Sequence, residues 1–161
     1  MKKTHYKKLM NPNYLGSWDV DPEVGYLDIT LIRVDKELVT QPGGEKEECV
    51  VATLKDHKPM ILNSTNLKAI KKVFQSPYIE DWKNKTVRVQ VEKVKAFGDI
   101  WDALRIKVEK VDTRPELNQK SEKWQGAIDA LKNGKCDMEL IKKNFRVTQE
   151  DIKKLEEASN A

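Results

Sequence analysis

The chain has 161 residues, of which 39% are hydrophobic and 35% are charged. Together with a mean hydropathy of -0.70, this composition is typical of a compact globular core under a heavily charged surface. No stretch approaches the roughly 18 apolar residues that a membrane span needs, and the basic residues 1–8 are not followed by an apolar run. We therefore expect a cytoplasmic protein without a membrane partner.

The charge of the chain is only mildly basic, with a formal net charge of +4 and a pI near 8.9. Residues 1–112 hold 20 basic and 17 acidic side chains, and residues 113–161 hold 10 and 9. Neither part is a polycation. This balance permits nucleic-acid binding without requiring it, so any phosphate binding must come from where the charges lie.

Few residues of the chain are suited to catalysis. His5 and His57 are its two histidines, one near the N-terminus and one in an expected loop, and neither suggests a catalytic triad. Cys49 and Cys136 have neither the spacing of a metal site nor that of a disulfide framework. The acidic residues between positions 45 and 48 lie in a hydrophilic hairpin tip, where charges are normally solvated. We expect no enzyme activity, no catalytic residue, no metal site and no cofactor.

Three strands are predicted in the first half of the chain. The segment YLDITLIRV (residues 26–34) is rich in β-branched residues and alternates in polarity, which predicts the first strand. Residues 35–48 contain Pro-Gly-Gly among charged residues and predict a long exposed turn. Residues 49–54 and the short run MIL at 60–62 predict the second and third strands.

A helix and two further strands follow. Residues 63–66 can cap a helix, and apolar side chains recur at i, i+3 and i+7 between residues 67 and 74, with lysines mainly on the other side. Valines alternate with polar residues over 86–94, and residues 101–108 predict the fifth strand. In that strand the inward residues would be Leu104, Ile106 and Val108, and the outward ones Trp101, Ala103, Arg105 and Lys107.

The predicted fold is mainly β with helices. The order β-β-β-α-β-β is that of a five-stranded OB-like barrel, in which the helix plugs the open end between the third and fourth strands. Residues 1–112 would form this barrel, with residues 9–20 wrapped around it, Tyr14 and Trp18 in its core, and Trp82 closing one end. Other small β-barrels, or an α+β sheet with one covering helix, share the same order of elements.

Residues 113–161 are expected to be a linker and a short helical appendage. Trp124, Ile128 and Leu131 share one helical face, a second helix starts near Met138, and Thr148 caps a third. Three short helices bury little surface alone. We therefore expect them to pack on the barrel, to pack on a partner, or to be only marginally stable.

Three segments carry a resemblance to a known family: KPMILNSTN (58–66), SPYIEDW (76–82) and VEKVKAFG (91–98). They resemble a family of small tailed-bacteriophage proteins, over roughly residues 8 to 108, and this family is likened to phage single-stranded-DNA-binding proteins of OB type. The resemblance implies a role in phage replication or recombination inside the bacterial host cell, where the protein would coat or guard single strands. It implies no particular binding residue.

The candidate binding residues come from the expected strand geometry. OB barrels bind single strands with basic side chains for the backbone and aromatic rings for the bases, and the loop between the fourth and fifth strands places Phe97 among lysines. Two alternatives remain: Phe97 folds back onto the barrel, and Trp101 packs beneath the C-terminal helices. The acidic tip at 45–48 opposes binding. The predicted nucleic-acid-binding residues are Arg88, Lys93, Lys95, Phe97, Trp101, Arg105 and Lys107.

Two functions follow as hypotheses. The first is sequence-tolerant binding of single-stranded DNA in phage replication or recombination, with the C-terminal helices as the contact for a replication or recombination protein. The second is a protein-interaction or virion-assembly module without nucleic-acid binding, in which Trp124 and Phe145 dock on a partner or on a second copy of the chain as a homo-oligomer.

Overall fold

The computed structural model describes residues 4–10 and 13–161. Residues 1–3 and 11–12, which belong to the basic start and to the segment expected to wrap the barrel, lie outside the described residues. The chain forms two compact units, which divide between Val111 and Asp112. No helix among the described residues is long and apolar enough to cross a membrane.

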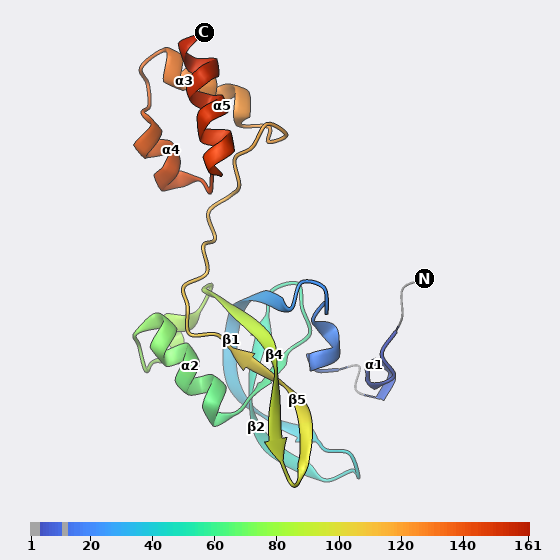
Figure 1. Ribbon diagram of the computed structural model, residues 1–161. Helices are drawn as coiled ribbons and strands as arrows, with labels where there is room; N and C mark the ends of the chain where they lie inside the picture. Colours follow the sequence, from blue (N-terminus) through green and yellow to red (C-terminus); the bar gives the residue numbers. More distant parts are fainter. Residues whose placement is uncertain (1–3, 11–12) are drawn as a thin grey trace. The chain divides into compact units, whose positions relative to one another are not determined.

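The first unit is built on a five-stranded antiparallel sheet with the strand order β3-β2-β1-β4-β5 (Figure 1). One helix, α2 (Ser64–Phe74), is inserted between β3 and β4. The predicted order of elements is therefore confirmed. The strands are β1 (Tyr26–Thr40), β2 (Lys46–Leu54), β3 (Met60–Leu62), β4 (Thr86–Ala96) and β5 (Asp99–Ile106).

The sheet is not closed into a barrel, so this part of the OB-type prediction is wrong. β3 has three residues and pairs with β2, which leaves β3 and β5 as the two edges. At the β5 edge the side chain of Asn66 takes the place of a neighbouring strand. Its amide nitrogen donates to the Leu104 carbonyl at 3.1 Å, and its oxygen accepts from the Ile106 amide at 3.1 Å. The arrangement is the α+β alternative, a sheet with a covering helix.

Local chemistry explains where α2 begins and ends. The side chain of Asn63 accepts a hydrogen bond from the Asn66 amide at 2.9 Å, the usual N-cap interaction. The helix ends at Gln75, whose φ of 54° is left-handed. Ile70 and Val73 are buried, whereas the lysines of the helix point to solvent. The predicted amphipathic helix is confirmed.

The main core lies between the sheet and α2. Ile29, Leu31, Val87 and Val89 are completely buried there, as their alternation predicts. Trp82, in the short 3-10 helix η2 (Ile79–Trp82), is also buried in this core, although the described sheet has no barrel end for it to close.

Three apolar residues differ from expectation. Val108 lies beyond the end of β5 and is 56% exposed, so the prediction that it points inward is wrong. Tyr14 and Trp18 are half-buried and belong to neither core cluster, although both were expected in the core. Trp18 lies in the 3-10 helix η1 (Ser17–Asp19), which follows the short helix α1 (Lys7–Met10).

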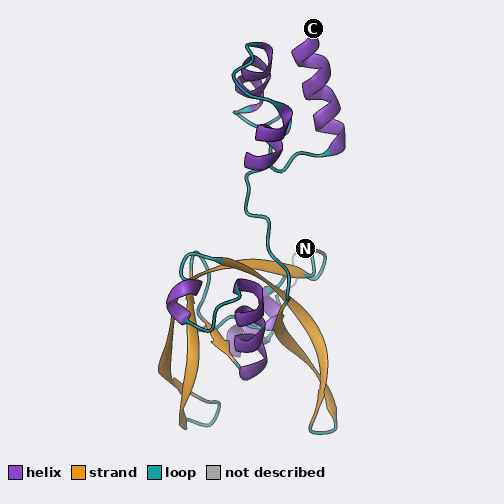
Figure 2. Ribbon diagram, turned by 90° about the vertical axis from the view of Figure 1, so that its left-hand side faces the viewer, coloured by secondary structure: helices purple, strands orange, loops and turns teal. Residues whose placement is uncertain are grey.

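Two hairpins extend from the sheet as separate arms (Figure 2). β1 pairs with β4 only up to Thr30; after an irregularity near Leu31 it pairs with β2 alone. We call residues 33–53 the β1–β2 arm and residues 91–104 the β4–β5 arm. The long exposed turn predicted over 35–48 is shorter than expected, because both strands continue to within a few residues of the Pro-Gly-Gly sequence.

The second unit has three helices: α3 (Trp124–Lys132), α4 (Met138–Asn144) and α5 (Gln149–Asn160). The side chain of Thr148 caps α5, as predicted. The helices enclose a core of Leu117, Ile128, Ile141 and Leu155. The second unit therefore has a core cluster of its own, separate from that of the first unit.

Candidate nucleic-acid interface

The β4–β5 arm carries most of the predicted binding residues, but on two faces. Opposite residues in the antiparallel register point to the same side, and Val89 with Ile106 marks the core side. Lys93 and Lys95 continue that side. Trp101 and Arg105 lie on the opposite side, together with Arg88 and Lys107.

Phe97 occupies the tip of the arm. The Ala96 and Asp99 pair closes a two-residue turn in which Phe97 and Gly98 both have left-handed backbones, with φ of 53° and 84°. This is the pattern of a type I′ turn, whose first position normally favours Asn, Asp or Gly. Phe97 is fully exposed to solvent. The alternative in which it folds back onto the core is therefore wrong.

Trp101 lies beside this turn and makes a hydrogen bond to it. Its indole nitrogen donates to the carbonyl of Ala96 at 3.1 Å, and Val94 is its cross-strand partner. The side chain is 49% exposed. The arm therefore presents two aromatic rings to solvent, one at the turn and one held against it.

The positive charge of Arg88 is already paired with carboxylates. Its guanidinium makes two hydrogen bonds to the carboxylate of Asp28, at 2.7 and 2.9 Å, and a third to Glu109 at 3.3 Å. It also lies 3.9 Å from the centre of the Tyr26 ring. The hydrogen bonds to Asp28 raise the pKa of Arg88 above its ordinary value. Binding a phosphate here would require these interactions to be exchanged.

The other predicted cations differ in whether a carboxylate already pairs with them. Lys93 lies 3.5 Å from a carboxylate oxygen of Asp102, and Lys107 lies 3.1 Å from Glu109. The Lys93 pair is exposed, and such pairs contribute little and exchange easily, whereas Glu109 is half-buried and also accepts from Arg88. Among the described residues, Lys95 and Arg105 have no carboxylate within 4.0 Å. Lys95 is exposed and is therefore the most available cation of the arm, whereas Arg105, just beyond the arm on the other face, is half-buried and donates to the Leu104 carbonyl at 3.4 Å.

The N-terminal segment adds an aromatic cluster beside β5 that sequence reasoning missed. The ammonium group of Lys7 lies 5.8 Å from the ring centre of Trp101 and also 5.8 Å from that of Trp18. The His5 ring is stacked on Trp18, with centres 6.3 Å apart and planes inclined by 20°. The available sequence signal was Gly16 two residues before Trp18, because a glycine allows a ring to approach the backbone closely.

The β1–β2 arm has a different surface. Its tip holds Glu45, Glu47 and Glu48, and the last two accept hydrogen bonds from Gln41 and Lys36, both at 2.9 Å. No aromatic residue lies in this arm. Burial, and to a smaller extent the charge of Glu47, raises the pKa of the Cys49 thiol. The arm therefore offers little for a nucleic-acid strand.

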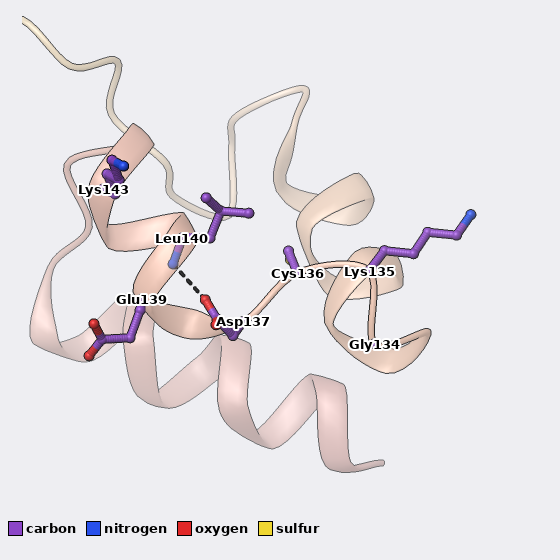
Figure 3. A pocket seen from close by; sticks show the side chains of 7 residues that line it. All are labelled: Gly134, Lys135, Cys136, Asp137, Glu139, Leu140 and Lys143. Atoms are coloured by element: carbon purple, nitrogen blue, oxygen red, sulfur yellow. Dashed lines mark hydrogen bonds between the residues drawn. The ribbon is translucent and has the colours of Figure 1, made fainter.

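The second unit contains an open depression of about 730 Å³ (Figure 3). It lies between the end of α3 and α4, with Lys135 and Lys143 on different sides of it and Leu140 and Cys136 between. Asp137 is occupied as the cap of α4, accepting from the Leu140 amide at 2.7 Å. Within residues 4–10 and 13–161, no group of three or more His, Cys, Asp or Glu side chains is placed to hold a metal ion.

No protein-family model matches this chain, and no curated protein or solved structure matches it. Support for a function therefore comes from the chain's own side chains. Within the first unit, the aromatic residues and cations of the β4–β5 arm and the N-terminal segment form the most distinctive surface.

Proposed function

We propose that the protein binds single-stranded DNA with little sequence preference, through the β4–β5 arm. The observation that carries the proposal is Phe97, a fully exposed ring held in a left-handed backbone at the tip of the arm. A phenylalanine there loses both turn stability and hydrophobic burial, and such costs concentrate at functional sites. Stacking of a base on the ring explains why a phenylalanine stands at this position despite these costs.

The surroundings of Phe97 support this ligand. Trp101 offers a second exposed ring that is already oriented by its hydrogen bond to the turn. Lys95 and Arg105 lie within the same hairpin, and neither is paired with a carboxylate among the described residues, so their charges are not already balanced when a phosphate approaches. Aromatic rings with interleaved cations bind single strands without reading their sequence, because every base has a flat face. In a duplex the bases are already stacked on one another, so a duplex gains less binding free energy from these rings.

We further propose that the open sheet is related to OB-type sheets, on the basis of its order of elements and the helix inserted after β3. A role in phage replication or recombination, in the cytoplasm of the bacterial host, is part of the same proposal. Its support is the sequence resemblance over roughly residues 8 to 108.

The experiment is fluorescence anisotropy of a labelled oligo-dT at two salt concentrations, with an equally long duplex as competitor. We expect binding that weakens with salt, because phosphate contacts release counterions. Phe97→Ala should weaken binding by about 1–3 kcal/mol, the value of one stacked base. The duplex should compete poorly.

Leu38→Ala is the matched control. Leu38 is an exposed apolar residue, 70% accessible, on the other arm. The Leu38 variant should bind as the unmodified protein does. No binding at low salt would refute the proposed function, and equal losses in the two variants would refute the role of the Phe97 ring.

A second candidate function, protein interaction or virion assembly, is favoured by the second unit having a core of its own. A separately folded helical unit on a linker can serve as a docking module. Truncation after Val111 distinguishes the two. Strand binding should survive it if the β4–β5 arm is the site, whereas association with a partner or a second copy should be lost if the helices are the site.

A further inference from the structure

The N-terminal segment places a second tryptophan next to the β4–β5 arm. Because Lys7 lies 5.8 Å from the ring centres of both Trp18 and Trp101, the two rings lie within twice that distance of each other. They come from positions more than 80 residues apart in the sequence. Neighbouring bases of an extended strand could therefore reach both rings, and the Lys7 ammonium group is equally close to each of them.

Trp18 is held by the body of the unit and not by α1 alone. The amide of Leu15 donates to the carbonyl of Pro59 at 2.8 Å, and Asp19 forms an ion pair with Lys58 at 2.7 Å. The Gly16 amide also donates to the Asp19 carboxylate at 2.9 Å. A Cβ atom added at Gly16 would lie 2.3 Å from the Trp18 ring, so the glycine is needed for this ring position.

The contact with His5 indicates that Trp18 can accept a planar ligand. The exposed imidazole of His5 is stacked on its ring, so one face is covered by a side chain near the chain terminus that a base can replace. The indole nitrogen of Trp18 is buried and has no hydrogen-bond acceptor among the described residues. Because this nitrogen is buried, a strand stacked on the ring does not reach it, and the ring is positioned by packing and not by a hydrogen bond of its own.

We propose that Trp18 and Lys7 extend the strand-binding surface, so that a single strand passes from Phe97 over Trp101 to Trp18. Trp18 stacks a base in place of His5, and the Lys7 ammonium meets the phosphate between the two tryptophans. This inference rests on the proposed function. It places the strand along the outer face of β5 and the N-terminal segment, away from the acidic tip of the β1–β2 arm.

The test is photocrosslinking of the full chain to an oligonucleotide that carries 5-iododeoxyuridine, followed by mapping of the linked peptides. This base links to aromatic side chains that it touches. Because the experiment uses the unmodified chain, its result does not depend on whether a variant folds. We expect links to Trp18 as well as to Phe97 or Trp101. Links confined to the β4–β5 arm would overturn the extension while leaving the proposed function intact.

Two variants measured by anisotropy complete the test. Trp18→Leu should weaken binding about five-fold to a hundred-fold, the range for loss of one stacked base. Lys7→Ala should lower the slope of log affinity against log salt by about one, because one phosphate contact is lost. Lys7 lies in a helix without buried residues, so its replacement leaves the core unchanged.

Lys72→Ala, an exposed lysine of α2, is the matched control and should leave the salt slope unchanged. A Lys7 variant that behaves like the Lys72 variant, with Phe97→Ala still weakening binding, would refute the N-terminal path alone. Absence of any oligonucleotide binding by the unmodified chain would refute both the path and the proposed function.

Discussion

The two arms of the first unit are both antiparallel hairpins, but their tips have opposite character. The β1–β2 arm ends in a turn with Gly43 and Gly44, both at positive φ, beside acidic side chains. The β4–β5 arm ends in a two-residue turn that places an exposed phenylalanine at positive φ. At the first tip both of these residues are glycines, which adopt positive φ readily, whereas at the second tip a phenylalanine precedes the glycine Gly98.

The bases of the arms also differ. β2 is supported on its outer side by β3 through a regular ladder, whereas β5 is supported by one asparagine side chain from α2. Regular pairing tolerates the loss of any one side chain. The β4–β5 arm, in contrast, depends on Asn66.

The largest expected effect is therefore that of Asn66→Ala. It leaves the Leu104 carbonyl and the Ile106 amide without partners in a buried place, which should lower the free energy of unfolding by about 2–4 kcal/mol. Urea denaturation monitored by tryptophan fluorescence measures it. Asn66→Asp retains the acceptor for Ile106 and loses the donor to Leu104. A loss for the alanine variant below that of an ordinary surface substitution would show that the edge of β5 needs no such support.

Phe97→Asn separates stability from binding. Asparagine adopts the left-handed conformation more easily, so the free energy of unfolding should rise by roughly 1 kcal/mol. Affinity for oligo-dT should fall by about 1–3 kcal/mol, because the stacking ring is lost. Thermal denaturation and anisotropy measure the two changes. A variant that is less stable, or that binds as well as the unmodified chain, would contradict the interpretation of the tip.

Arg88→Met tests whether the outer face near β1 belongs to the site. The partly buried pair with Asp28 should make the variant less stable by about 1 kcal/mol. Because the guanidinium is already neutralised, oligonucleotide affinity should change little. Arg105→Met is the comparison, and it should weaken binding with little cost in stability. Equal losses of affinity in the two variants would show that Arg88 belongs to the binding surface.

The smallest expected effect concerns the second unit. Hydrogen bonds from Arg114 lower the pKa of Asp112 from its ordinary value of 3.8 to about 2. Because the folded pKa is depressed, any stabilisation from the pair is fully present above pH 3.8 and is lost as the pH falls through about 2. A carboxyl ¹³C titration should find the low midpoint, and Arg114→Gln should return it towards 3.8. An unchanged midpoint in that variant would assign the shift to another cause.

The sequence by itself determined the order of the elements. The alternation of Val87, Val89 and Val91 and the helical spacing of Leu67, Ile70 and Phe74 are local patterns, and local patterns depend only on neighbouring residues. The exposure of Phe97 was the sharper of two interpretations of a short turn. The structure decided between them.

Only the tertiary structure determined which residues far apart in the sequence lie next to each other. Closure of the sheet depended on whether β3 or a side chain from α2 reaches β5, and sequence spacing carries no information on that competition. The pairing of Arg88 with Asp28 and the approach of Lys7 to Trp101 likewise join residues that are far apart in the chain. Local sequence patterns do not show such contacts, so Trp18 was expected in the core and was found half-buried, with the Lys7 ammonium group 5.8 Å from the centre of its ring and from that of Trp101.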